Sequence, residues 1–184
     1  IRRPPRSTPL YSSAESDVYK RQVLLSDHLV GRRFLLGERP GSSDFGTFGQ
    51  LTQLAQTDPT CRDLTLEVAP RVFAWCDNVE DLSGLEPQDD DWMKQNEIPE
   101  TLIKILKEIG RTYAPFLIAN AEAVSKGEEE WESKIDGKLW KQMPFVYQAK
   151  CLNWIKEEFE KLQKEQKAKI FQLLEGTGCE ILIN

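Results

Sequence analysis

The feature of this sequence that most constrains its fold is an apolar stripe with helical spacing in the middle of the chain. Its members are Leu102, Ile105, Leu106, Ile109, Tyr113, Phe116 and Leu117. Because they recur at intervals of three and four residues, they fall on one face of an α-helix. Pro115 lies inside the stripe, so we expect the helix to kink or break there, and we expect Gly127 to end it.

Shorter stripes of the same kind predict helices before this one. Residues 23–30 are expected to form the end of a longer helix, and a second helix is expected from about Ser42 to Asp58-Pro59. A third is expected to begin near Pro70. The apolar positions that define these helices are Val23, Leu24, Leu25, Leu29, Val30, Phe45, Phe48, Leu51, Leu54, Val68, Val72, Trp75, Cys76 and Val79.

The remaining segments complete the prediction of the fold. Residues 85–97 read as a polar linker, and an Asp-Gly pair at 136–137 between two short runs predicts a small β-hairpin at about 132–142. A long helix is expected after Pro144, and a last short helix is expected to stop at Gly176. We therefore expect an all-α domain of about seven helices with one small hairpin and no internal repeat.

Charge and composition exclude several classes of function. The net charge of the 184-residue chain is −6, and residues 1–22 alone carry +3, so the remainder is strongly acidic. Such a charge argues against nucleic-acid binding, which depends on basic side chains. No apolar run approaches the length of a membrane span and no secretory signal is evident, so we expect a cytoplasmic protein without a membrane partner. The four cysteines lack metal-site spacing and are expected to be reduced thiols: Cys61, Cys76, Cys151 and Cys179.

The first 22 residues differ from the rest of the chain. They read IRRPPRSTPLYSSAESDVYKRQ, show no helical or strand periodicity and are rich in Arg, Pro and Ser. A native basic tail is one interpretation. The string also resembles the translation of sequencing-adapter DNA, which predicts that residues 1–22 are a non-native, disordered leader and that the native N-terminal part is missing. We therefore expect residues 23–184 to form the folded domain.

Few side chains suggest chemistry, and each has a simpler structural interpretation. His28 is the single histidine and stands in no catalytic motif, so a surface or helix-packing role is expected. The carboxylates of residues 89–91 and 128–130 lack the spacing of a calcium loop and are expected to be solvated. Gly37, Gly41 and Gly46 do not form a phosphate loop and read as turn and close-packing glycines.

The five tryptophans are expected to pack in the core or at its edge, with a contribution to a ligand pocket as the minor alternative. They are Trp75, Trp92, Trp131, Trp140 and Trp154.

One local pattern predicts a structural helix cap at Gly41, Ser42 and Asp44. The Asp44 carboxylate stands three residues after Gly41, where it can accept a hydrogen bond from the cap backbone and complement the helix dipole. Pro40 and Phe45 occupy the positions of a hydrophobic staple. If Ser42 caps instead of Gly41, the helix starts one residue later.

The segment that contains this cap resembles a known family. FLLGERPGSSDF at 34–45, Asp58-Pro59 and APRVFAW at 69–75 are similar to the C-terminal all-helical domain of the glutathione S-transferase superfamily. YAPFLIAN at 113–120 and YQAKCL at 147–152 resemble a bacterial branch of such proteins. Gly41 is a departure, since the family usually has Ser or Thr at this position.

The resemblance implies a glutathione S-transferase C-terminal-like helical bundle that belongs to a larger protein. In that family an N-terminal thioredoxin-like domain binds and activates glutathione, and the helical domain supplies the electrophile pocket, packing surfaces and possible homodimer contacts. Nothing before Val23 has the pattern of a thioredoxin-like domain. No catalytic, cofactor-binding or metal-binding residue is therefore assigned to this chain, and glutathione is expected as the cofactor of the full-length parent only.

Three hypotheses about function follow from the sequence. The chain is a fragment of a glutathione transferase, inactive alone, or it is a non-catalytic helical module of the same superfamily used for binding or assembly. The third hypothesis is an unrelated helical enzyme, whose active site would have to consist of carboxylates alone.

Overall fold

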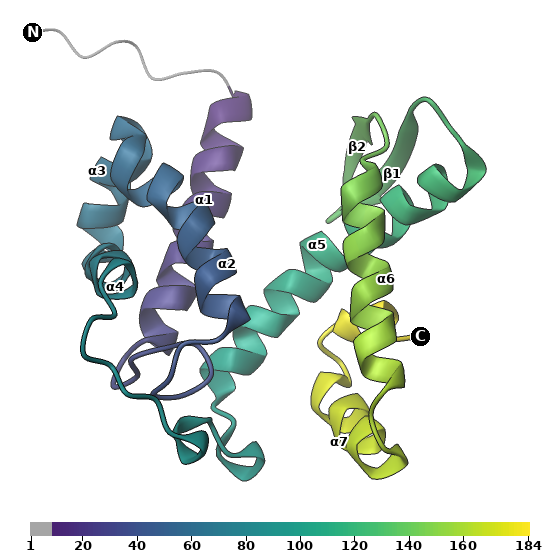
Figure 1. The fold of residues 1–184 in the computed structure, drawn as a ribbon. Helices are drawn as coiled ribbons and strands as arrows, with labels where there is room; N and C mark the ends of the chain where they lie inside the picture. Colours follow the sequence, from purple (N-terminus) through teal and green to yellow (C-terminus); the bar gives the residue numbers. More distant parts are fainter. Residues whose placement is uncertain (1–8) are drawn as a thin grey trace, which may run out of the picture. The chain divides into compact units, whose positions relative to one another are not determined.

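The computed structural model describes the backbone of residues 9–184 and the side chains of residues 19–184, and it divides into two compact units. Unit 1 ends at Leu102, and unit 2 comprises Ile103–Asn184. Both units are mainly helical, and the described residues contain seven α-helices and one two-stranded sheet (Figure 1). The prediction of a mainly helical chain with one small hairpin is confirmed.

Unit 1 contains two 3-10 turns, Asp89–Asp91 and Gln95–Glu97. Its core is built from four α-helices and one π-helix. They are α1 (Pro9–His28), α2 (Ser42–Leu51), the π-helix Thr52–Thr57, α3 (Pro59–Val68) and α4 (Pro70–Glu80). Helix α1 packs against α3 and α4, and α2 packs against α4. The buried apolar cluster between them consists of Leu29, Phe34, Leu51, Ala55, Ala69, Val72, Trp75, Cys76 and Val79.

Helix α1 begins inside the segment that we expected to be disordered. Residues 9–22 continue the helix that ends at His28, so the expectation of disorder does not hold for them. The sequence of residues 9–22 has no apolar stripe of the kind that predicts the other helices, so periodicity did not predict this part of α1. Gln22 is buried, and its amide donates to the Thr65 hydroxyl of α3 at 2.5 Å. The earlier part of the leader, residues 1–8, lies outside the described residues.

The helix predicted from Ser42 begins there, but it changes its geometry before it ends. The Asp58 N–H bonds to the Gln53 carbonyl at 2.9 Å, five residues back, which is the hydrogen bond of a π-helix. The same Asp58 then caps α3, because its carboxylate accepts from the Cys61 N–H at 2.8 Å and Pro59 follows it. The sequence stripes did not predict α3.

Unit 2 contains most of the long helix α5 (Glu100–Lys126), a hairpin and two further helices. The hairpin consists of β1 (Trp131–Ile135) and β2 (Lys138–Gln142), and it is followed by α6 (Val146–Glu160) and α7 (Lys164–Leu174). A 3-10 turn, Cys179–Leu182, ends the chain. We expected Pro115 to kink or break this helix, but α5 continues through it. The flanking Ala114 and Leu117 side chains are fully buried, and their packing offsets the one hydrogen bond that proline removes.

The predicted hairpin is present at its expected position. The strands pair antiparallel in a register that sets Ser133 opposite Trp140 and Ile135 opposite Lys138. Asp136 and Gly137 connect them with φ angles of 48° and 76°. Two positive φ values in a two-residue loop define the turn type that matches the twist of the strands, and Asp-Gly is among the pairs that adopt it at least cost.

Candidate functional site

The buried carboxylate of Asp44 organises the segment that carries the family resemblance. Asp44 has no exposed surface, and its two oxygens accept from the backbone N–H groups of Leu35 at 2.8 Å and Gly41 at 2.9 Å. The Gly41 carbonyl in turn accepts from the Asp44 N–H at 3.0 Å. The predicted bond between Asp44 and the cap is therefore present, and the carboxylate also holds the preceding loop at Leu35.

The structure shows which residue caps α2 and whether Phe45 packs beside the cap. Gly41 is the residue before the first helical turn, so the helix starts at Ser42 as expected with glycine as the cap. Phe45, which we placed in a hydrophobic staple, is half exposed. The helix start therefore depends mainly on the hydrogen bonds of Asp44 and on the favourable position of its charge at a helix N-terminus.

The side chain of His28 is buried and connects Leu35 to Thr101. Its Nε2 lies 2.8 Å from the Leu35 carbonyl oxygen and its Nδ1 lies 2.9 Å from the Thr101 hydroxyl. Since a carbonyl only accepts, Nε2 carries the proton and Nδ1 accepts from Thr101. Burial lowers the pKa of His28 below 6.5, the Leu35 carbonyl opposes that shift, and the charge of Arg32 adds to it. The expected helix-packing role is the one that these contacts describe.

Trp75 connects the same loop to α4. Its indole N–H donates to the Arg33 carbonyl at 3.1 Å, while its ring is buried in the apolar cluster beside Phe34 and Val72. The loop at 33–44 is thus held from α1 by His28, from α2 by Asp44 and from α4 by Trp75. These bonds give it a fixed conformation on the surface of unit 1.

Residues 85–97, predicted to be a polar linker, are docked on that loop. The Met93 N–H donates to the Leu36 carbonyl at 2.7 Å, and the Glu38 N–H donates to the Asp91 carbonyl at 2.8 Å. Gly37 allows this approach, because a Cβ there would lie 2.8 Å from the Met93 nitrogen and its φ is 137°. This contact could not be predicted from the sequence, because its hydrogen bonds are made by backbone groups.

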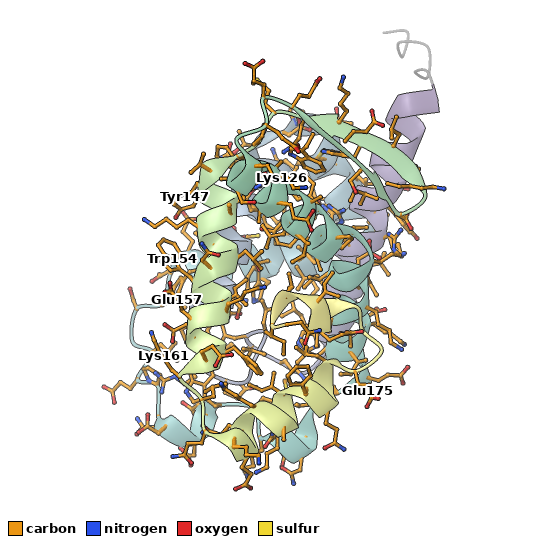
Figure 2. All side chains as sticks on the ribbon, turned by 90° about the vertical axis from the view of Figure 1, so that its right-hand side faces the viewer. Lys126, Tyr147, Trp154, Glu157, Lys161 and Glu175 are labelled. Atoms are coloured by element: carbon orange, nitrogen blue, oxygen red, sulfur yellow. The ribbon has the colours of Figure 1, made fainter. Side chains whose placement is uncertain are left out.

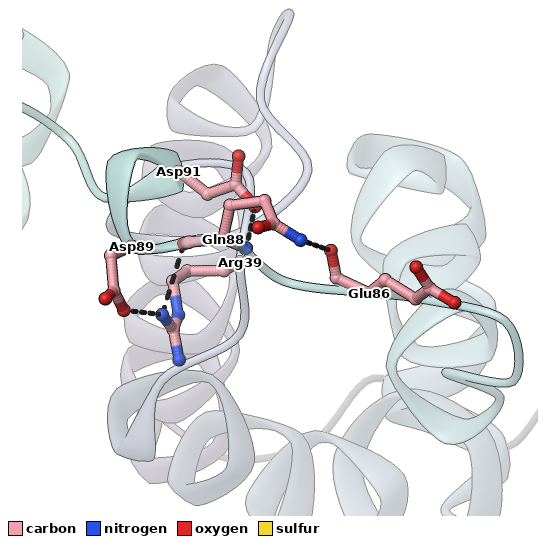
Figure 3. A network of polar contacts seen from close by, with 5 residues as sticks. All are labelled: Arg39, Glu86, Gln88, Asp89 and Asp91. Atoms are coloured by element: carbon pink, nitrogen blue, oxygen red, sulfur yellow. Dashed lines mark hydrogen bonds and ion pairs between the residues drawn. The ribbon is translucent and has the colours of Figure 1, made fainter.

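Arg39 contacts the docked segment, and Figure 3 shows its bonds to Gln88 and Asp89. The Arg39 guanidinium lies 4.7 Å from the centre of the Trp92 ring and donates to the Asp89 carboxylate and the Gln88 carbonyl, each at 3.2 Å. Asp91 accepts from the Gln88 N–H at 2.7 Å. The acidic run thus stabilises two local turns, and its carboxylates have different partners rather than a common centre.

Two polar side chains in unit 2, Asn120 and Arg111, make contacts that were not predicted from the sequence. Asn120 is fully buried and exchanges two hydrogen bonds with the Phe145 backbone, at 2.7 and 2.9 Å. Arg111 forms a bidentate pair with the largely buried Glu108 and an ion pair with Asp136 in the hairpin turn. Phe145 lies 25 residues from Asn120, and Asp136 lies equally far from Arg111, so periodicity could not reveal these two contacts.

Two of the four cysteine thiols, those of Cys76 and Cys179, have their reactivity lowered by burial. Burial raises the pKa of the Cys76 thiol to about 11 and raises that of Cys179 as well. All four cysteines lie among the described residues and none is in a disulfide. A thiol with a raised pKa holds little thiolate at neutral pH, so Cys76 and Cys179 act as small apolar side chains.

The described residues contain neither a metal-binding group of three His, Cys, Asp or Glu side chains nor a helix with the length and apolar composition to cross a membrane. An open hollow of about 350 Å³ in unit 2 is lined by Phe171, Gln172, Glu175, Glu180 and Asn184. Glu128, Glu129 and Glu130 are exposed as expected.

Comparisons with protein families, characterised proteins and solved structures found no match to this chain.

Proposed function

We propose that this chain is the C-terminal helical part of a glutathione S-transferase-like protein. It supplies electrophile-pocket and packing surfaces to a thioredoxin-like domain, and that domain binds glutathione and activates its thiol. The observation that carries the proposal is the conformation of residues 33–45, in which the Asp44 carboxylate holds Leu35 and Gly41 together.

The residues on which the resemblance rests also build one packed structure. Phe34 and Val72 come from the two most similar segments and are fully buried in one apolar cluster. Trp75 joins those segments through its bond to Arg33. A resemblance whose residues pack against each other supports a shared local fold, whereas scattered identities would not.

Unit 1 suits a supporting role in the reaction. The activation of glutathione requires a group that stabilises a thiolate, such as a nearby hydroxyl, a cation or a helix N-terminus. In unit 1, Asp44 is committed to two backbone donors and His28 to Leu35 and Thr101. We therefore assign thiol activation to the thioredoxin-like domain and the shape of the electrophile pocket to the helices.

The experiment that tests the proposal has two arms. Calorimetry of this chain with glutathione is expected to show no binding in the micromolar range. A protein that joins the chain to the thioredoxin-like domain encoded upstream in its gene is expected to bind glutathione and to transfer it to a halogenated nitroarene. Micromolar binding to the chain alone, or an upstream reading frame without a thioredoxin-like domain, would contradict the proposal.

A second candidate function is a non-catalytic module for binding or assembly. It is favoured by the number of large apolar side chains that unit 2 exposes around the hairpin and the start of α6: Leu139, Trp140, Met143, Phe145, Val146 and Tyr147. The joined protein separates the two candidates. Glutathione transfer supports the enzyme, while a folded protein that is inert toward electrophiles supports the module.

A further inference from the structure

Part of the docked segment lies against the loop at 33–44 as a short added strand. The backbone bonds of Asp91 and Met93 to the loop, at 2.8 and 2.7 Å, stand on either side of Trp92. Between them Trp92 and Gly37 pair as residues of antiparallel strands do. A Cβ at position 37 would overlap the Asp91 carbonyl oxygen, so this edge admits a second strand only because the residue is glycine. Many proteins bind extended peptides by such backbone pairing at a strand edge.

The Trp92 side chain has a fitted place on the same loop. A Cβ on Gly41 would lie 3.0 Å from the ring, so the ring occupies the space into which a side chain at position 41 would project. The φ of Gly41 is −123°, a value open to any residue, and glycine is therefore needed for space rather than for backbone conformation. Arg39 lies over the ring with its guanidinium 4.7 Å from the ring centre, a cation–π contact. The loop thus holds an aromatic side chain where the family that it resembles usually has Ser or Thr.

Arg39 also makes a charged contact with the docked segment. Its Nη1 donates to the Asp89 carboxylate and to the Gln88 carbonyl, each at 3.2 Å (Figure 3). The Asp89 side chain is fully exposed, so this ion pair contributes little to holding the segment. The Nε of Arg39 is buried and has no acceptor among the described residues. Because a guanidinium can bind a carboxylate through two parallel N–H groups, the docked segment uses only part of the binding capacity of Arg39.

We propose that the loop at 33–44 is a binding site for an extended segment of another protein, and that residues 88–93 occupy this site as an internal ligand. The segment that the site recognises carries a carboxylate three residues before an aromatic side chain, which is the spacing of Asp89 and Trp92. Its carboxylate pairs with the guanidinium, its ring rests on the cap of α2, and its backbone adds to the edge of the loop. A partner whose carboxylate reaches two N–H groups of the guanidinium displaces the internal ligand. This inference rests on unit 1 alone and does not depend on the proposed function.

A partner can enter the site only if the docked segment opens without unfolding of unit 1. Trp92 is 40% exposed, so the segment buries little of its largest apolar side chain and we expect it to open locally. In hydrogen exchange of the wild type followed by NMR, the Glu38 and Met93 amides are expected to exchange at least about tenfold faster than the Cys76 amide in α4. Equal protection of these amides would mean that the segment leaves only when unit 1 unfolds, which would overturn the proposal.

A labelled synthetic peptide of residues 86–95 tests the site directly by fluorescence anisotropy. The full chain with Asp89→Ala and Trp92→Ala lacks both side chains of the internal ligand, and it is expected to bind the peptide at least about tenfold more tightly than the wild type. Addition of Arg39→Gln is expected to weaken that binding at least about tenfold. Lys161→Gln is the matched control, because it removes one positive charge at an exposed position of α6 in unit 2 (Figure 2), and it is expected to leave the binding unchanged.

Variants of the peptide separate specific recognition from general attraction of charge. Trp92→Ala in the peptide is expected to abolish binding, and Asp89→Asn is expected to weaken it about threefold. Asp90→Asn makes the same change of charge on the next carboxylate and is expected to bind as the unchanged peptide does. The proposal is overturned if the chain without its internal ligand keeps the helical circular-dichroism signal of the wild type but binds no peptide. It is also overturned if Arg39→Gln has no effect, or if the two aspartate variants of the peptide bind alike.

Discussion

The loop at 33–44 in unit 1 is fixed by buried polar side chains, whereas α5 and the segment before the last turn in unit 2 cross in close backbone contact. Asp44 and His28 are fully buried in unit 1, and their hydrogen bonds go to the loop at 33–44. In unit 2, α5 and the segment before the last turn meet at Gly110 and Gly178, where a Cβ on either glycine would meet backbone of the other segment.

This difference means that the two units should respond to opposite kinds of substitution. Removal of a polar atom from unit 1 leaves a buried donor without a partner, which costs free energy. Addition of a methyl group to the crossing in unit 2 forces two backbone segments apart. Hydrogen exchange measured by mass spectrometry reports on each unit separately, so both effects can be assigned to their own part of the chain.

The largest effect is expected for Asp44→Ala. The substitution leaves the N–H groups of Leu35 and Gly41 without their acceptor and is expected to lower the free energy of unfolding of unit 1 by about 4 kcal/mol. Asp44→Asn keeps one acceptor oxygen and should lose roughly half as much. A loss of less than about 1 kcal/mol for Asp44→Ala, measured by urea unfolding, would show that the polar anchor is dispensable.

The steric counterpart in unit 2 is Gly110→Ala. The added Cβ would lie 2.7 Å from the Gly178 carbonyl carbon and closer still to the Thr177 carbonyl oxygen. We expect a loss of about 3 kcal/mol in the stability of unit 2. Gly49→Ala is the control, since a Cβ there meets nothing within 4 Å in α2 and should stabilise unit 1 by up to about 1 kcal/mol. If Gly110→Ala and Gly49→Ala changed stability equally, the close backbone crossing at Gly110 would not limit the stability of unit 2.

A smaller loss of stability in unit 1 is expected when the pH is lowered. Because burial holds the pKa of His28 in the folded protein below 6.5, the unfolded chain binds its proton first as the pH falls. The stability of unit 1 should therefore be constant above about pH 7 and should decrease below about pH 6.5, by at most about 1.4 kcal/mol per pH unit. His28→Gln should abolish this slope between about pH 7 and pH 5.5, before most carboxylates titrate. An unchanged slope would assign it to another group.

The smallest effect is expected for Asp136→Asn in the hairpin turn. The substitution removes the charge that pairs with Arg111, but both side chains are partly exposed, so we expect a loss of about 0.5 kcal/mol. Asparagine also tolerates the positive φ of this position. Asp136→Val, which does not, should cost more than the lost ion pair. If the two variants proved equally stable, backbone conformation would not limit the turn.

The sequence predicted those parts of the fold that depend on local signals. The turn at Asp136-Gly137, the start of α2 at Ser42 and the stop at Gly127 follow from the conformational preferences of a few adjacent residues. The apolar stripes located α4, α5, α6 and α7 for the same reason. These features depend on partners within about one helical turn, although α3 was not predicted despite its local cap at Asp58.

The parts that the sequence did not predict depend on partners far along the chain. Docking of residues 85–97 uses backbone groups, which carry no sequence signal. Continuation of α5 through Pro115 reflects the burial of its neighbours, a tertiary effect that overrides propensity. In the candidate site, the bond from Asp44 to Gly41 was predicted because it is local. The bond from Asp44 to Leu35 and the bridge made by His28 to Thr101 were not.

The π-helix at Thr52–Thr57 determines where the length of this chain can vary. A π-turn spans one residue more than an α-turn between bonded groups, as the bond from Asp58 to Gln53 shows. Deletion of one exposed residue there, such as Gln53 or Leu54, would let the segment close as α-helix while α2 and α3 keep their own residues. A single-residue deletion between Thr52 and Thr57 should therefore be tolerated better than one inside α2 or α3.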